Sequence, residues 1–146
     1  MKLSTNSRYG LRAMVDLAAN YGGEPVALRD IAKRQRISES YLEQAFSTLR
    51  KAGLLKSVKG ALGGYAPADD PEYLKVGVIL RVLEGDLSII GNGSVYNGSD
   101  PVKRCIKATV WDAADRKITD TVDSVTLSDL AQEYKRMRGD ALEYCI

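Results

Sequence analysis

A six-residue turn with three glycines, at residues 59–64, restricts the fold more than any other part of this sequence. The turn reads Lys59-Gly60-Ala61-Leu62-Gly63-Gly64, and short segments suited to strands flank it at 54–58 and 65–66. Glycine adopts backbone conformations, and tolerates close approaches, that other residues do not. We therefore predict a sharp β-hairpin at this point in the chain.

Three segments with helical spacing of apolar residues precede the hairpin. We predict helices over residues 7–21, over about two turns from residue 28, and over residues 39–52. The third helix ends at Gly53 and begins either after Ser38 as N-cap or at the capping box formed by Ser40 and Glu43. The apolar positions that define the three helices are Leu11, Met14, Val15, Ala18, Tyr21, Leu28, Ile31, Ala32, Leu42, Ala45, Phe46 and Leu49.

The sequence after the hairpin divides into three parts. An apolar helix over residues 76–83 ends at Gly85 and is expected to close the core of an N-terminal domain, residues 1–85. Residues 86–100 are rich in Gly, Asn and Ser and predict a flexible loop. Asp100-Pro101 starts a long helix in a C-terminal region, residues 101–146. Its apolar stripe is too exposed in a small monomer, so we expect it to pair with the same helix of a second copy.

Composition excludes several classes of protein. The sequence has no histidine and only two cysteines, Cys105 and Cys145, so neither a structural metal site nor a disulfide framework is expected. We find no nucleophile with its base, no paired-carboxylate motif and no phosphate-binding loop, so the chain is not expected to be an enzyme. No apolar run is long enough to span a membrane and no secretion signal is present, so we expect a cytoplasmic protein.

Charge is distributed unevenly between the two halves. Lys and Arg outnumber Asp and Glu 11 to 5 in residues 1–66, whereas the acidic residues outnumber the basic ones 14 to 10 in residues 67–146. A basic N-terminal half followed by an acidic C-terminal half indicates that the N-terminal half binds a polyanion.

Three helices followed by a glycine-rich hairpin are typical of a winged helix-turn-helix, a mainly α fold with one small β-hairpin. The third helix of this fold lies in the major groove of DNA, where Ser40, Glu43 and Gln44 would address base edges. Arg50, Lys51, Lys56 and Lys59 are placed to neutralise phosphates. The tip of the hairpin, Lys59-Gly60, is expected to enter a minor groove.

Several ordered motifs resemble a bacterial family of winged-helix regulators that includes IscR, NsrR and CymR. The resemblance covers nearly the whole chain, and it implies a homodimer joined through the long C-terminal helices. It also implies that DNA is contacted by Ser38, Ser40, Tyr41, Glu43, Gln44, Arg50, Lys59 and Gly60. The motifs are Ser4-Thr5-x-x-Arg8-Tyr9-Gly10, Ile37-Ser38-x-x-Tyr41-Leu42-Glu43-Gln44, Leu49-Arg50-x-x-Gly53-Leu54, Lys59-Gly60-x-x-Gly63-Gly64-Tyr65, Val82-Leu83-Glu84-Gly85 and Thr126-Leu127-Ser128-Asp129-Leu130.

Two departures from the family pattern refine this expectation. Many members have arginine where this chain has Lys59, so reading of the minor groove is expected to be less selective. Iron-sulfur members bring three closely spaced cysteines, whereas residues 91–104 contain none and only Cys105 matches a ligand position. The resemblance is therefore to the cluster-free, CymR-like subset, which represses genes of sulfur uptake and cysteine synthesis together with cysteine synthase.

Two alternatives remain open from the sequence. Cys105, near the start of the long helix, is either a redox-sensing thiol or a small apolar residue of the dimer helix. The winged helix is either a DNA-binding domain or a module that binds only proteins. Trp111, Asp112 and Asp115 are interpreted as packing and solvated residues of the long helix rather than as a site.

Overall fold

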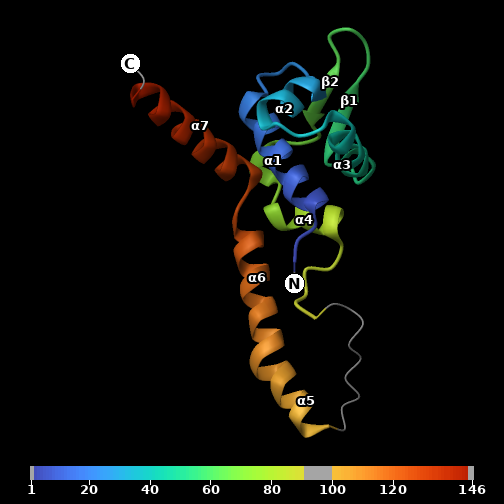
Figure 1. Ribbon diagram of the computed structural model, residues 1–146, viewed down its shortest axis with the longest axis vertical. Helices are drawn as coiled ribbons and strands as arrows, with labels where there is room; N and C mark the ends of the chain where they lie inside the picture. Colours follow the sequence, from blue (N-terminus) through green and yellow to red (C-terminus); the bar gives the residue numbers. More distant parts are fainter. Residues whose placement is uncertain (1, 91–99, 145–146) are drawn as a thin grey trace.

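A computed structural model describes residues 2–90 and 100–144, with side chains described up to residue 139. A compact N-terminal body carries two projecting helical arms (Figure 1). The predicted fold class, mainly helical with one two-stranded hairpin, is confirmed. The elements are α1 (Thr5–Asn20), α2 (Leu28–Gln35), α3 (Glu39–Lys51), β1 (Leu55–Val58), β2 (Gly64–Pro67), the 3₁₀ turn η1 (Pro71–Tyr73), α4 (Val76–Glu84), α5 (Pro101–Ile106), the π turn η2 (Lys107–Trp111), α6 (Asp112–Ser124) and α7 (Leu127–Tyr144).

Side-chain caps fix where several of these helices begin. Ser38, and not Ser40, is the N-cap of α3, and its hydroxyl accepts a hydrogen bond from the backbone N–H of Tyr41. Asp100 caps α5 by accepting from the N–H groups of Val102 and Lys103, as expected for a helix that starts at Pro101. Satisfying these otherwise orphaned N–H groups is what lets each helix start at a defined residue.

The hairpin pairs β1 with β2 in antiparallel register, from Leu55 opposite Pro67 to Val58 opposite Gly64. Val26 extends this small sheet, because it exchanges two backbone hydrogen bonds of 2.8 Å with Tyr65. A β-carbon on Gly64 would collide with the carbonyl of Val26, so this close approach requires glycine. The bridge attaches the hairpin to the segment that leads into α2.

One core joins the first four helices to the last one. Its fully buried members come from α1, α2, α3 and α4, and Leu127 and Ala131 of α7 belong to the same cluster. The strand-like pairing of Lys75 with Thr126 brings the start of α7 to this position. The predicted division into residues 1–85 and 101–146 is therefore crossed by packing contacts at α7. The largest fully buried side chains are Phe46, Met14, Leu17, Ile31, Leu42, Leu49, Ile79 and Leu127.

The long helix predicted to start at Asp100-Pro101 is present as α5, the π turn η2 and α6, and it leads away from the body (Figure 1). Every residue from 101 to 110 is exposed, including the apolar Val102, Ile106 and Val110. The greater part of the predicted loop, residues 91–99, lies outside the described residues. Over the described part of the chain, no helix combines the length and the apolar character needed to cross a membrane.

Candidate nucleic-acid interface

Helix α3 separates its residues into a buried face and an exposed face, as its sequence predicts. Leu42, Ala45, Phe46 and Leu49 are buried against the body. The exposed face has a mixed chemistry of hydroxyl, carboxylate and amide groups, which are the groups that recognise base edges in a major groove. It presents Ser38, Ser40, Tyr41, Glu43, Gln44 and Thr48.

The N-terminal end of this exposed face is held by a small hydroxyl network. The Ser38 and Ser40 hydroxyl oxygens lie 2.8 Å apart, and Ser38 also accepts from the N–H of Tyr41 at 3.4 Å. Ser38 therefore has a capping role in addition to its predicted contact with DNA. Farther along the helix, Thr48 donates to the carbonyl of Gln44.

The hairpin lies beside α3 and is attached to it through the core (Figure 1). The rings of Phe46 on α3 and Tyr65 on β2 meet edge to face, with centroids 5.1 Å apart. The predicted wing residues Lys56, Lys59 and Gly60 are all exposed. A cleft of about 300 Å³ lies between the hairpin and the starts of α2 and α3.

The turn of the hairpin needs glycine at two positions. Gly60 has a φ of +111°, which other residues rarely adopt. A β-carbon on Gly63 would collide with the backbone of Val58 and Lys59. In this turn the exposed Lys59 lies next to Gly60, which has no side chain.

Exposed cations lie on α3 and on the elements next to it in the chain. Arg29 lies on α2, Arg36 is its C-cap, Arg50 lies in the last turn of α3, Lys56 lies on β1 and Lys59 lies in the hairpin turn, and all five are exposed. The predicted phosphate-binding residues Arg50, Lys56 and Lys59 therefore lie on α3 itself and on the hairpin that contacts it. Such an arrangement suits a duplex, whose phosphates line both sides of each groove.

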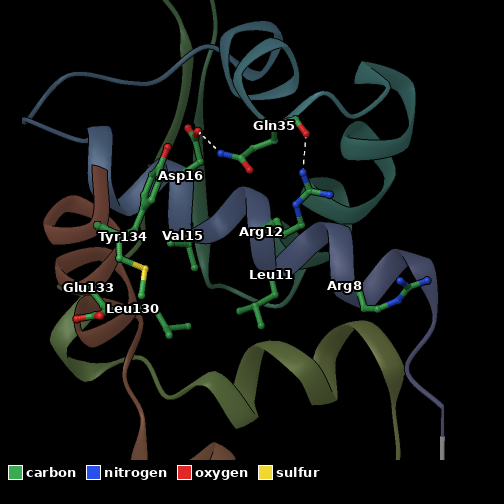
Figure 2. A pocket seen from close by; sticks show the side chains of 10 residues that line it. Arg8, Leu11, Arg12, Val15, Asp16, Gln35, Leu130, Glu133 and Tyr134 are labelled. Atoms are coloured by element: carbon green, nitrogen blue, oxygen red, sulfur yellow. Dashed lines mark hydrogen bonds between the residues drawn. The ribbon is translucent and has the colours of Figure 1, made fainter. Parts of the chain in front are cut away.

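Helix α1 supports α3 through residues that the sequence analysis did not single out for this role. The Tyr9 and Tyr41 rings meet edge to face at 5.7 Å, and the guanidinium of Arg12 lies 5.5 Å from the centre of the Tyr9 ring. Arg12 also donates to the carbonyl of Gln35 at 2.6 Å (Figure 2). Tyr41, a predicted DNA contact, is therefore held in place by packing against α1.

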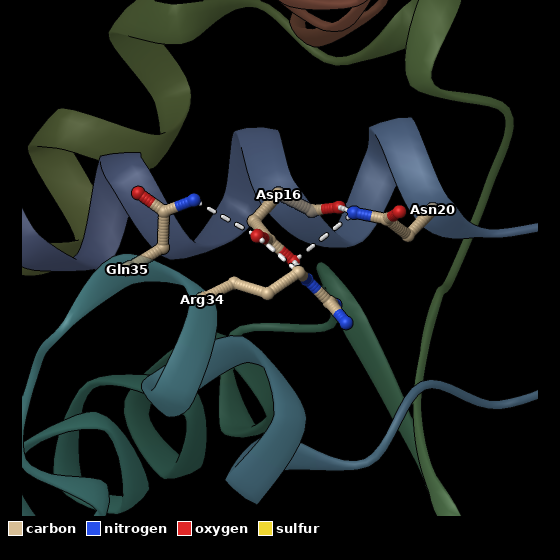
Figure 3. A network of polar contacts seen from close by, with 4 residues as sticks. All are labelled: Asp16, Asn20, Arg34 and Gln35. Carbon is tan, nitrogen blue, oxygen red and sulfur yellow. Dashed lines mark hydrogen bonds and ion pairs between the residues drawn. The ribbon is translucent and has the colours of Figure 1, made fainter. Parts of the chain in front are cut away.

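A second unpredicted feature is a buried carboxylate on α1. Asp16 has no exposed surface and accepts hydrogen bonds from Arg34 and Gln35 on α2 and from Asn20 on α1 (Figure 3). We call these four residues the Asp16 network. The hydrogen bond with Asp16 raises the pKa of Arg34 above its ordinary value.

The thiol of Cys105 is exposed on α5, away from α3 and the hairpin. The described residues contain no group of three or more His, Cys, Asp and Glu side chains placed to hold a metal ion. The full sequence has two cysteines and no histidine, whereas an iron-sulfur cluster ordinarily takes about four such ligands.

Comparison with known proteins agrees with this geometry. The model of the Rrf2 family, described as an iron-dependent transcriptional regulator, matches residues 3–133. The regulator CymR of Bacillus subtilis is 44% identical over 131 residues, which are 90% of each chain. IscR of Vibrio vulnificus is 38% identical over 136 residues, which are 91% of this chain and 79% of that protein.

Solved structures give the same result. The structure of B. subtilis CymR has a TM-score of 0.78 at 41% identity and covers 91% of this chain and 98% of that one. The structure of T. potens IscR has a TM-score of 0.73 at 44% identity and covers 92% of this chain and 88% of that one. These relatives are regulators of transcription and not enzymes. The chain belongs to the Rrf2 family of transcriptional regulators.

Proposed function

We propose that this chain is a homodimeric, sequence-specific DNA-binding regulator in which α3 reads the major groove and the hairpin enters the adjacent minor groove. The observation that carries the proposal is the polar, exposed face of α3 beside a hairpin whose tip bears Lys59 and Gly60. Direct contacts are assigned to Ser38, Ser40, Tyr41, Glu43, Gln44, Arg50, Lys56, Lys59 and Gly60.

The proposed dimer is supported by the apolar residues of the long helix. Val102, Ile106 and Val110 are 67%, 40% and 47% exposed and recur at every fourth position, so they form one stripe along α5 and the π turn. Exposed apolar stripes of this kind are ordinarily buried in an interface. Pairing two long helices around a two-fold axis would bury both stripes and present two α3 helices to a two-fold related operator.

Within the family we propose the cluster-free role: repression of sulfur-uptake and cysteine-synthesis genes together with cysteine synthase. Two observations support it. The chain lacks the cysteines that would hold a cluster, and its similarity extends over nearly the whole length of B. subtilis CymR, whose structure is described as that of the global cysteine regulator of that organism.

The test is a titration of the reduced protein into fluorescently labelled DNA taken from upstream of cysteine-synthesis genes, with and without cysteine synthase. We expect the enzyme to tighten binding and O-acetylserine, the cysteine precursor, to reverse this effect. If neither cysteine synthase nor O-acetylserine changes the affinity for DNA, the cysteine synthase partnership is wrong, whereas the DNA-binding function is unaffected. No binding to any duplex, at low as well as at moderate salt, would favour a winged helix that binds only proteins.

Two variants test the proposed division of the DNA-binding surface into residues that contact bases and residues that contact phosphates. Gln44→Ala removes a predicted base contact, so it should weaken binding to the operator and leave binding to unrelated DNA unchanged. Lys56→Ala removes a predicted phosphate contact, so it should weaken binding to both duplexes and reduce their salt dependence. If both variants lose the same affinity for both duplexes, the proposal that α3 contacts the bases is wrong.

Regulation by oxidation of Cys105 is a second candidate, supported by the exposure of its thiol near the start of α5. A Cys105→Ser variant separates it from the first. If peroxide releases the wild-type protein from DNA and fails to release the variant, Cys105 is the sensor. If both respond alike, this candidate is excluded.

A further inference from the structure

The Asp16 network joins α1 to the end of α2, immediately before the turn that leads into α3. Arg34 donates to both carboxylate oxygens of Asp16, with its Nε 3.1 Å from each and its Nη2 2.7 Å from Oδ1. The side-chain nitrogen of Gln35 lies 2.8 Å from Oδ2 (Figure 3). Arg34 and Gln35 are the last two residues of α2, so the network fixes this end of the helix.

The backbone at the same point is held by a second residue of α1. Arg12, one turn before Asp16, donates to the carbonyl of Gln35 at 2.6 Å (Figure 2). Gln35 is therefore bound to α1 through both its side chain and its main chain. A rotation or shift of the end of α2 would have to break both contacts.

Only three residues separate this point from the reading helix. Arg36 takes a left-handed conformation with a φ of +56°, Ile37 donates to the carbonyl of Ala32, and Ser38 then caps α3. Because this turn is short and α3 begins directly after it, the position of Gln35 determines where the first turn of α3 lies. Ser40 and Glu43, on the exposed face of α3, follow within two turns.

Stability alone does not account for a buried ion pair here. Taking a carboxylate out of water costs several kcal/mol, and apolar residues often replace such pairs without loss of stability. Asp16 is 0% exposed, while Arg34 keeps 36% of its side-chain surface in solvent. The carboxylate of Asp16 accepts directional hydrogen bonds from both α1 and α2. It is therefore suited to fixing the position of one helix relative to the other.

We infer that Asp16 is a positioning residue for DNA reading, which acts through Arg34 and Gln35 to place the first turn of α3 against the bases. This inference rests on the proposed function, because it presumes that α3 reads DNA. It assigns to Asp16 no contact with DNA itself. Its effect therefore falls on the discrimination between sequences and not on affinity for DNA in general.

The experiment uses two variants of the full chain. Asp16→Asn keeps the shape of the side chain and replaces one acceptor oxygen with a donor that faces Arg34 or Gln35. The double variant Asp16→Asn with Arg34→Met removes both charges, leaves the net charge unchanged and avoids an unpaired cation. The matched control, Glu133→Gln with Arg136→Met, removes an ion pair on α7 whose members lie three residues apart.

The probes are a duplex selected by the wild-type protein from a randomised library and a scrambled duplex of the same composition. We expect the two Asp16 variants to lose about tenfold in affinity for the selected duplex, the equivalent of about one base contact, and less than about twofold for the scrambled one. Amide hydrogen exchange in residues 36–41 should accelerate in both variants, with exchange in α4 unchanged. The control should behave as the wild type in all three measurements.

The outcomes separate this inference from the proposed function. Variants that fold, shown by an unchanged circular dichroism spectrum, and that keep the wild-type ratio of the two affinities would overturn the positioning role alone. A wild-type protein that selects no sequence from the library would overturn the proposed function, and the inference with it. If Asp16→Asn fails to fold, the charge-neutral double variant decides between the first two outcomes.

Discussion

Gly77 on α4 lies so close to the carboxylate of Asp123 on α6 that a β-carbon at this position would collide with it. The same carboxylate forms a two-point ion pair with Arg81, at 2.8 and 3.0 Å. The absence of a side chain at Gly77 therefore lets the long helix pack against α4 and be joined to it by charge. The ion pair also lowers the pKa of Asp123.

We predict that Gly77→Ala destabilises the protein, although alanine ordinarily favours a helix over glycine by about 1 kcal/mol. The new methyl group displaces Asp123 from Arg81, so the ion pair is lost. In an Asp123→Ala background the same substitution should stabilise. The measurement is urea unfolding of the wild type, the two single variants and the double variant. Gly139→Ala on α7, where a β-carbon has open space, is the control and should stabilise; a stabilising Gly77→Ala in the wild-type background contradicts the prediction.

Acid should weaken the contact between Glu84, at the end of α4, and the start of α1. Glu84 accepts hydrogen bonds from the Ser4 hydroxyl, at 2.6 Å, from the Ser7 hydroxyl and from the backbone N–H of Ser4, and these bonds lower its pKa. A carboxylate with a lowered folded pKa stabilises above its unfolded pKa, about 4.3, and loses that contribution as the pH falls through the folded value.

Glu84→Gln should therefore be less stable than the wild type near neutral pH, and the difference should shrink as the pH falls from about 6 to about 3. The measurement is the free energy of unfolding in urea across this range. Glu72→Gln, on the exposed turn η1, serves as the control and should show no such convergence. A constant difference between wild type and Glu84→Gln would show that the carboxylate charge does not matter.

The dimer should depend on the stripe along α5. Ile106→Asp places a charge in the middle of the proposed helix pair, where it would be buried without a partner, so we expect dissociation to monomers. Sedimentation velocity over a range of concentrations measures this. Lys117→Asp, an exposed change on α6, is the control. A dimer that survives Ile106→Asp would place the interface elsewhere.

Arginine at the hairpin tip should strengthen minor-groove binding. Its weakly hydrated, planar guanidinium enters a narrow A·T-rich groove more readily than the ammonium group of Lys59. We expect Lys59→Arg to bind a duplex with an A-tract next to the α3 site several-fold more tightly than the wild type, and to show no gain on the matching G·C-rich duplex. Equal gains on both duplexes would indicate contact with phosphates only.

Local patterns in the sequence were enough to predict α1 to α4, the helix that starts at Pro101, the hairpin and the exposed face of α3. Apolar periodicity marks the buried side of α3, and the remaining positions, such as Gln44, are then exposed by elimination. The choice between Ser38 and Ser40 as N-cap could not be made from sequence, since both fit a capping pattern. The structure assigns the cap to Ser38.

Relationships between distant residues could not be predicted in this way. Asp16 looks like an ordinary polar residue of the first helix, and its partner Arg34 lies on another helix, 18 residues later in the chain. Sequence periodicity shows that Leu127 is apolar but not that it packs against residues more than a hundred positions earlier. The directions in which helices cross decide both contacts, and no local pattern encodes those directions.

The place of α7 in the core has a consequence for how the protein is made. Met14 and Leu17 are synthesised more than a hundred residues before Leu127 and Ala131, which belong to the same cluster. The nascent chain must therefore hold an incomplete core until residues 127–131 have left the ribosome. A message truncated before codon 127 would yield a product with apolar surface open to proteases, so damaged messages would not leave behind a stable fragment able to occupy operators.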